Sequence, residues 1–137
     1  MTSSSYRYDF SLWYCEEDED IASCICHTLE QQGFRGYCEH RDQVAGMLVV
    51  STICEVIQAS RAAILVLSRR TIGDRWRQRI TEWNLVNIVQ GNAGKIIPVY
   101  VDITRDQGPL TLRWMSSLTY SSKFFKKRLL ESLKSRR

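Results

Sequence analysis

Apolar residues fall in short runs that are separated by longer stretches in which they recur every three or four positions. Short runs rich in β-branched and aromatic residues are typical of strands, and the longer spacing is typical of amphipathic helices. The strand-like runs cover residues 8–14, 34–38, 62–67, 95–101 and 115–120. The helix-like stretches cover residues 21–32, 48–59, 76–89 and 123–136. This alternation predicts an α/β domain, with a mostly parallel sheet flanked by helices on both faces.

The pattern also indicates where individual strands lie. The run at 62–67 is apolar without a break, which is typical of a strand covered on both faces. In the first run, Phe10, Leu12 and Tyr14 alternate with residues of the opposite face. Pro98 predicts an edge strand or a bulge, because proline has no N–H to donate to a neighbouring strand.

The stretch from 37 to 50 is expected to be a strand–loop–helix junction, and it combines features that loops seldom share. Gly46 allows backbone angles that residues with a Cβ resist. Loops run over the surface, yet Val44 and Met47 are apolar. Two interpretations are open: these side chains fold back onto the following helix, or they are offered to a partner.

Chain length, apolar runs and charge bear on the number of domains, on location and on association. With 137 residues the chain suits one domain, which we place at 6–137, after a frayed N-terminal stretch or cloning remnant at 1–5. No apolar run approaches the ~20 residues that span a bilayer, so we expect a cytoplasmic protein or an intracellular part of a longer one. Residues 1–60 carry 3 basic and 10 acidic side chains, whereas residues 61–137 carry 16 basic and 5 acidic. Such a split could steer association electrostatically.

Motifs for most enzyme chemistries are missing. The glycines form no phosphate-binding fingerprint, and there is neither a Cys-x-x-Cys pair nor a serine nucleophile elbow. Cys24 and Cys26 are two apart on a predicted helix, which makes a poor metal pair. The five acidic residues at 16–20 are expected to complement and cap a helix N-terminus rather than to bind metal. We therefore expect no metal and no cofactor.

The cysteines are expected to be reduced thiols, because five is an odd number for a disulfide framework. Cys24, Cys54 and Cys38 are predicted to be buried and to behave as small apolar residues. Cys15, at a strand end beside acidic residues, is predicted to be the accessible thiol.

Five segments resemble, in order and spacing, the characteristic boxes of the Toll/interleukin-1 receptor (TIR) domain family. They are YDFSLWY at 8–14, HRDQVAG at 40–46, SRAAILVLS at 60–68, Trp76, and Phe124–Phe125. The resemblance covers nearly the whole chain. It implies a flavodoxin-like fold with five strands in the order 2-1-3-4-5.

The resemblance also implies a role in innate immune signalling, through homotypic contacts with other TIR domains, and self-association of the chain is a further expectation. In receptors and adaptors of this family the second box makes such contacts. The corresponding partner-binding candidates are Arg41, Asp42, Gln43, Val44, Ala45, Gly46 and Met47. Ala45 stands where the family usually has proline, so the loop has one φ angle fewer fixed.

Some TIR domains cleave NAD at the nicotinamide–ribose bond, with a glutamate four residues after the tryptophan matched by Trp76. This chain has Ile80 at that position. Glu82 is the nearest acidic residue, but two further helical positions rotate it by about 200°. On this basis the chain is expected not to be an enzyme. An NAD-cleaving TIR domain and an excised receptor tail remain the alternatives.

The chain is similar, from the second box onward, to Mal/TIRAP-type adaptors, which favours a cytosolic adaptor. The terminal helix is basic, and a solvated face is the simplest interpretation. Weak contact with anionic membrane is the alternative, whereas nucleic-acid binding is not expected because no aromatic stacking platform accompanies the charge. The basic residues are Lys123, Lys126, Lys127, Arg128, Lys134, Arg136 and Arg137.

Overall fold

The computed structural model describes residues 6–89 and 94–134. The predicted frayed segment at 1–5 and the predicted end of the last helix at 135–136 lie outside these ranges. None of the helices in the described part of the chain has the length and apolar character needed to cross a membrane.

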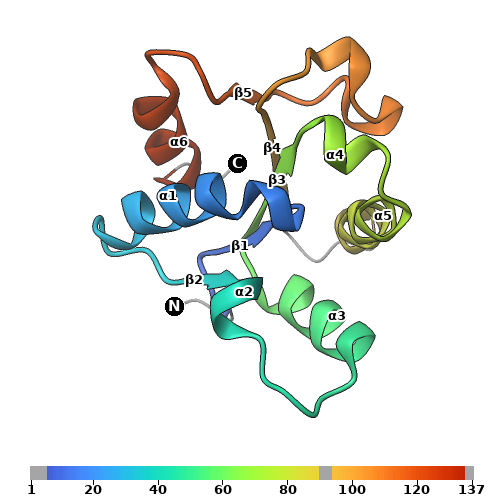
Figure 1. Ribbon diagram of the computed structural model, residues 1–137. Helices are drawn as coiled ribbons and strands as arrows, with labels where there is room; N and C mark the ends of the chain where they lie inside the picture. Colours follow the sequence, from blue (N-terminus) through green and yellow to red (C-terminus); the bar gives the residue numbers. More distant parts are fainter. Residues whose placement is uncertain (1–5, 90–93, 135–137) are drawn as a thin grey trace.

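The strands form one sheet in the order β2-β1-β3-β4-β5, and every pairing is parallel (Figure 1). This confirms the predicted fold class and strand order. The strands are β1 (Phe10–Trp13), β2 (Gly36–Cys38), β3 (Ala62–Leu67), β4 (Lys95–Tyr100) and β5 (Leu118–Thr119). Parallel neighbours require crossover connections, and the intervening helices provide them.

The prediction that Pro98 marks an edge strand or a bulge is wrong. Pro98 lies within β4, which pairs with β3 on one side and β5 on the other. The proline is tolerated there because β5 is short and pairs only with Val99 and Tyr100. The sheet therefore has no paired residue beside Pro98 on the β5 side, where a missing N–H would matter.

Helices cover both faces of the sheet. They are α1 (Glu19–Glu30), α2 (Glu39–Asp42), α3 (Val49–Ala59), α4 (Arg69–Ile72), α5 (Arg75–Val89) and α6 (Phe125–Lys134). Three 3-10 turns, η1 (Glu16–Asp18), η2 (Arg105–Gln107) and η3 (Leu110–Leu112), lie in connections. The four-residue helices α2 and α4 fall where the sequence predicts loops, because single helical turns are too short to show a periodic pattern.

Two apolar cores sit on opposite faces of the sheet. One contains the side chains of Phe10 and Leu12 with α1 and the end of α6. The other contains Trp13 with α3, Ile80 of α5 and the alternate residues of β3. All six residues of β3 are buried, as the unbroken apolar run predicts. The predicted division of β1 into two faces is confirmed.

Two expectations about cysteines are wrong, and the acidic run at 16–20 places Glu19 and Asp20 in the first turn of α1 without a side-chain cap. Cys15 is buried, because it follows β1 at the centre of the sheet, and Cys24 is exposed on the outer face of α1. Asp18 does not cap α1; it is 3% exposed and accepts a 2.6 Å hydrogen bond from the Ser68 hydroxyl. A carboxylate that is held by a side chain of the segment after β3 is no longer available to the helix end.

Candidate functional site

A turn projects from the end of the β2–α2 segment and carries a group of exposed apolar side chains. The turn, residues 43–48, separates α2 from α3 (Figure 1). Val44 is 65% exposed, Met47 61% and Leu48 77%. Gly46 has a φ of +87°, a conformation that glycine adopts readily and L-residues resist. We call residues 43–48 the projecting turn.

Apolar exposure continues into the first turn of α3. Val49 and Val50 are 43% and 49% exposed, whereas Ile53, one turn further, is buried. Scattered exposed apolar residues need no explanation, but a contiguous group often marks an interaction surface. Of the two interpretations of the turn, the structure supports the one in which Val44 and Met47 face outward.

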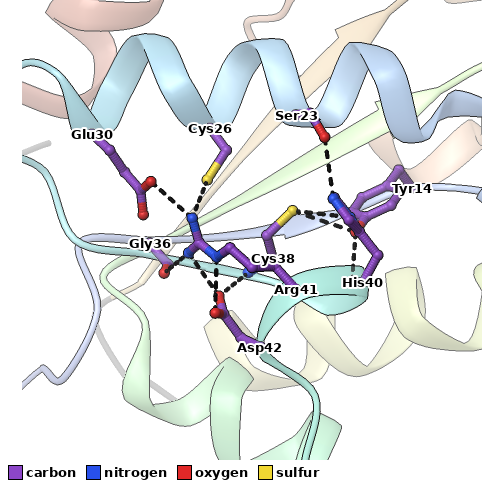
Figure 2. Close-up of polar contacts among 9 residues, drawn as sticks. All are labelled: Tyr14, Ser23, Cys26, Glu30, Gly36, Cys38, His40, Arg41 and Asp42. Carbon is purple, nitrogen blue, oxygen red and sulfur yellow. Dashed lines mark hydrogen bonds and ion pairs between the residues drawn. The ribbon is translucent and has the colours of Figure 1, made fainter.

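Arg41 anchors the base of the projecting turn (Figure 2). Its guanidinium donates hydrogen bonds to both carboxylate oxygens of Asp42, at 2.8 and 2.7 Å, and to Glu30 of α1 at 2.8 Å. It also donates to the Gly36 carbonyl at 3.1 Å and to Cys26 Sγ at 3.4 Å. A planar guanidinium with five N–H donors can satisfy several acceptors at once. Arg41 thus links α2 to both β2 and α1.

Asp42 completes this anchor. Its carboxylate accepts the Cys38 backbone N–H at 2.9 Å as well as the two bonds from Arg41. Burial acts to raise the pKa of Asp42, but the hydrogen bonds from Arg41 and Cys38 outweigh it, so the pKa lies below its ordinary value. The hydrogen bonds that Arg41 donates to Asp42, and then the one that it donates to Glu30, raise the pKa of Arg41. Both charges therefore persist at neutral pH.

A second cluster of polar groups lies beside this anchor. The Tyr14 hydroxyl accepts the His40 backbone N–H at 2.9 Å, hydrogen-bonds to His40 Nδ1, and lies 3.4 Å from Cys38 Sγ. His40 Nε2 is 3.1 Å from the Ser23 hydroxyl of α1. Burial, followed by the hydrogen bond with Cys38, raises the pKa of Tyr14 well above its ordinary value. Tyr14 therefore stays protonated and fixes the start of α2 against β1.

An ion pair connects the same segment to the opposite side of the domain. Arg77 Nη1 of α5 lies 3.1 Å from Glu39 Oε1 of α2, and both side chains are about 85% buried, with exposures of 15% and 14%. The projecting turn is thus supported from α1, β2 and α5.

The carboxyl ends of β1 and β3 meet where the strand order reverses, which is the usual ligand crevice of a doubly wound sheet. There the Ser68 hydroxyl donates to buried Asp18, and Thr71 donates to the Val66 carbonyl at 3.1 Å. Arg70 lies 3.4 Å from Asp18. We call Asp18, Ser68, Arg70 and Thr71 the switch-point cluster.

A cavity of about 250 Å³ lies near the same edge of the sheet, between the α4–α5 segment and the loop that follows β4. Glu82, an exposed residue of α5, lines it together with Gln78 and Thr81. Its volume is slightly below the ~300 Å³ at which small-molecule sites begin. Ile80, by contrast, is buried in the apolar core.

The seven predicted site residues are consecutive in the sequence, but the structure gives them two different environments. Arg41 and Asp42 turn toward the body of the domain, whereas Gln43, Val44, Ala45, Gly46 and Met47 are exposed. The prediction omits Leu48 and Val50, whose exposure belongs to the same surface. The uninterrupted run MLVV at 47–50 is the signal that would have included them, because a helix start with four apolar residues in sequence cannot bury them all.

These features define a TIR domain: a parallel sheet in the order 2-1-3-4-5 with a turn projecting between α2 and α3. The family model described as "TIR domain" matches residues 10–133. The chain belongs to the TIR domain family.

The chain is also similar to a curated adaptor protein. The human Toll/interleukin-1 receptor domain-containing adapter protein is 25% identical over 122 residues, which are 82% of this chain and 52% of the relative. The predicted likeness to this adaptor type is confirmed. This chain spans about half the length of that relative.

Two solved structures share the fold. A TIR-STING receptor from C. gigas, in complex with 2′,3′-cGAMP, superposes with a TM-score of 0.81 at 19% identity, covering 98% of this chain and 42% of that one. The TIR domains of the activated Roq1 resistosome, which recognises the effector XopQ, give 0.74 at 16% identity, covering 93% and 97%.

The expectation that this chain is not an enzyme is contradicted by these two likenesses. That expectation depended on the argument that Glu82 is rotated about the helix axis, away from the direction of residue 80. In the structure, Glu82 lines a cavity near the carboxyl edge of the sheet. Its carboxylate therefore lies away from the direction of residue 80 but still faces a pocket. The absence of a glutamate at 80 is therefore no ground for excluding catalysis.

Proposed function

We propose that this domain acts in innate immune signalling by associating with other TIR domains, in the manner of a cytoplasmic adaptor, and that the projecting turn is its main contact. The observation that carries the proposal is a turn with three side chains more than 60% exposed, Val44, Met47 and Leu48, on a base held by Arg41 and Asp42. Support for the adaptor role comes from the similarity to the human adapter protein.

The two parts of the site have separate roles in this proposal. Val44, Met47 and Leu48 supply apolar area to the interface, and Gln43, Ala45 and Gly46 set the shape of the turn. Arg41 and Asp42 are positioning residues that hold the turn in its outward conformation. A small surface on a fixed base suits a transient interface, because little ordering is required on binding.

The test compares two apolar-to-acid substitutions in binding assays with a panel of purified TIR domains. Met47→Asp changes the projecting turn, and Leu110→Asp changes a residue of η3 that is equally exposed, at 66% against 61%. We expect Met47→Asp to weaken association at least tenfold and Leu110→Asp to leave it within twofold. Equal effects from the two variants would show that the turn is not the contact.

NAD cleavage is a second candidate, favoured by the position of Glu82 at the cavity beside α4 and α5. Cleavage of the nicotinamide–ribose bond develops positive charge on the ribose, which a carboxylate stabilises. The test is release of nicotinamide from NAD at high protein concentration by the wild type and by Glu82→Gln. Release that persists in Glu82→Gln, or no release by the wild type, rejects this role for Glu82.

The basic face of α6 leads to a smaller proposal about membranes. Lys126, Lys127 and Arg128 are exposed there, as is Phe124 just before the helix. Exposed basic residues near an anionic lipid surface contribute about 1 kcal/mol each. Co-sedimentation with phosphatidylserine vesicles at low salt, reversed by high salt, is the expected result. Absence of binding at low salt would dismiss it.

A further inference from the structure

A serine and a histidine meet at the surface between α1 and α2, and the proposed association with TIR domains uses neither of them. Ser23 Oγ of α1 lies 3.1 Å from Nε2 of His40 in α2, and both residues are exposed. Figure 2 shows the two side chains pointing toward each other from these helices. A hydroxyl within hydrogen-bond reach of a base, which a third group in turn orients, is the signature of an activated nucleophile.

Two groups orient the imidazole through its other nitrogen. The Tyr14 hydroxyl hydrogen-bonds to His40 Nδ1 and accepts the His40 backbone N–H at 2.9 Å. Oε2 of Glu19, in the first turn of α1, lies 3.7 Å from the same Nδ1. The ring is therefore held at Nδ1 while Nε2 faces Ser23.

The same groups determine which ring nitrogen carries the proton of the neutral imidazole. A carboxylate beside Nδ1 favours the tautomer with its proton on Nδ1, as in catalytic triads. The Tyr14 oxygen can accept this N–H, because the Tyr14 O–H has another partner in Cys38 Sγ at 3.4 Å. Cys38 Sγ lies 3.3 Å from Nδ1 and is a second acceptor for it. Nε2 is then unprotonated and accepts the Ser23 O–H.

From this arrangement we infer that Ser23 is a modification site, a hydroxyl that His40 activates to accept an acyl group from an activated ester or thioester. The inference does not rest on the proposed association with TIR domains. It concerns one transfer to the protein and not turnover of a substrate. No sequence motif indicates the site, because Ser23 and His40 are 17 positions apart.

The transfer balances in two stages. Ser23 Oγ attacks the carbonyl carbon of the donor while His40 Nε2 takes the hydroxyl proton, and the Glu19 carboxylate stabilises the resulting imidazolium. The tetrahedral intermediate then breaks its bond to the leaving alcohol or thiol, which takes the proton from Nε2. The products are O-acyl Ser23 and the free alcohol or thiol, and His40 is neutral again.

Acylation would alter the contact between α1 and α2. An O-acyl serine has no O–H, so the hydrogen bond from Ser23 to His40 Nε2 would be lost. His40 directly precedes Arg41 in α2, and Arg41 anchors the projecting turn. The modification would therefore weaken one of the contacts that hold the base of the turn.

The experiment treats the full chain with p-nitrophenyl acetate at neutral pH and follows the acetylation of individual residues by mass spectrometry. The parent protein carries Cys24→Ala, because the exposed Cys24 thiol adjoins Ser23 and competes for the reagent. Ser51, an exposed serine of α3, is the internal reference. We expect Ser23 to be acetylated at least tenfold faster than Ser51, and His40→Gln to reduce its rate to that of Ser51.

The carboxylate provides a matched pair of variants. Glu19→Gln removes the negative charge beside His40 Nδ1 and should slow the acetylation of Ser23 several-fold. Asp20→Asn removes an exposed carboxylate at the next position of α1 and should leave the rate unchanged. Equal slowing by both variants would mean that net charge, and not the position of Glu19, sets the rate.

Two further results would overturn the inference itself. Equal acetylation rates at Ser23 and Ser51 in the parent protein would show that the bond to His40 is only structural. An unchanged rate at Ser23 in His40→Gln, with circular dichroism like that of the parent, would show that His40 is not the base. If His40→Gln does not fold, the pH dependence of the parent decides. Acetylation of Ser23 should then fall more steeply than that of Ser51 toward acid pH, because a protonated imidazole cannot accept a proton, and parallel pH profiles would reject the inference.

Discussion

Two polar clusters occupy the carboxyl edge of the same sheet, and they have opposite effects on the segments beside them. Beneath the projecting turn, Arg41 and Asp42 bond to the body of the domain at side-chain exposures of 42% and 29%. In the switch-point cluster, Asp18 and Ser68 bond to each other at 3% and 0% exposure. The first cluster holds a neighbouring segment out into solvent, whereas the second draws two connections together.

The two clusters differ in whether their polar groups bond to each other or hold an exposed segment in place. Doubly wound sheets usually bind ligands where the strand order reverses. In this chain Asp18, Ser68 and Thr71 hydrogen-bond to one another and to backbone at that point. A contiguous group of exposed apolar side chains is found instead on the turn after β2. The switch-point cluster therefore acts mainly on stability, and the anchor of the turn acts mainly on recognition.

Breaking the switch-point cluster should have the largest effect on stability. Asp18→Ala leaves the buried Ser68 hydroxyl without its charged acceptor and Arg70 without its ion pair. We expect the free energy of unfolding to fall by about 2–3 kcal/mol, as for lost hydrogen bonds to buried charged groups. Urea denaturation measures this loss. Glu17→Ala, at the exposed position before it, should change stability by less than about 0.5 kcal/mol.

If both variants lose the same amount of stability, Asp18 has no special role in holding the two connections. We also expect Asp18→Ala, measured on its folded fraction, to associate with TIR domains as wild type does. A loss of affinity beyond the loss of folded protein would contradict the separation of the two clusters.

Two glycine substitutions sharpen the comparison further. Gly46→Ala places a Cβ on a residue with a φ of +87°, where nothing else lies within 4 Å. The expected cost is about 1–2 kcal/mol and arises from backbone strain alone. Gly73→Ala, at the end of α4, adds a Cβ in equally open space at a φ of −84° and should cost nothing. Thermal denaturation of the two variants checks the difference, and equal melting temperatures would refute it.

Periodicity predicts much of this fold because most elements bury one regular face. The unbroken apolar run of β3 and the alternation in β1 each correspond to a physical layer. Position in the sheet is harder to predict from one strand. Pro98 satisfies a local rule for edge strands, yet its place within β4 depends on the length of β5, a segment twenty residues further along the chain.

The site could be predicted only in part, for a similar reason. Loops run over the surface, which predicts exposure of this turn, and the exposed Val44 and Met47 agree. The partners of Arg41 come from α1 and β2, and local sequence does not indicate which acceptors a long side chain reaches. Long-range polar contacts of this kind carry no periodic signal.

Removing the anchor should free the turn at a modest cost in stability. Arg41→Ala deletes the hydrogen bonds to Asp42, Glu30 and the Gly36 carbonyl. Because the guanidinium is partly exposed, we expect the domain to lose only about 1 kcal/mol. Limited proteolysis within the projecting turn should become several-fold faster. Arg35→Ala, another exposed arginine, is the control, and equal cleavage rates for the two variants would mean that Arg41 does not hold the turn.

The smallest effect concerns the pH dependence of the same anchor. Because the folded-state pKa of Asp42 lies below the unfolded value of about 3.9, the unfolded chain binds more protons as the pH falls, and the contribution of Asp42 to stability is lost as the pH passes through its folded pKa. Wild type should therefore exceed Asp42→Asn by about 0.5 kcal/mol above pH 5, with the gap closing toward pH 2. Urea denaturation across this range measures the gap, with the exposed Asp106→Asn as the control for loss of charge alone. A gap that widens as the pH falls would mean that Asp42 is not held as a carboxylate by Arg41 and the Cys38 N–H, and the turn would then have a different base from the one described.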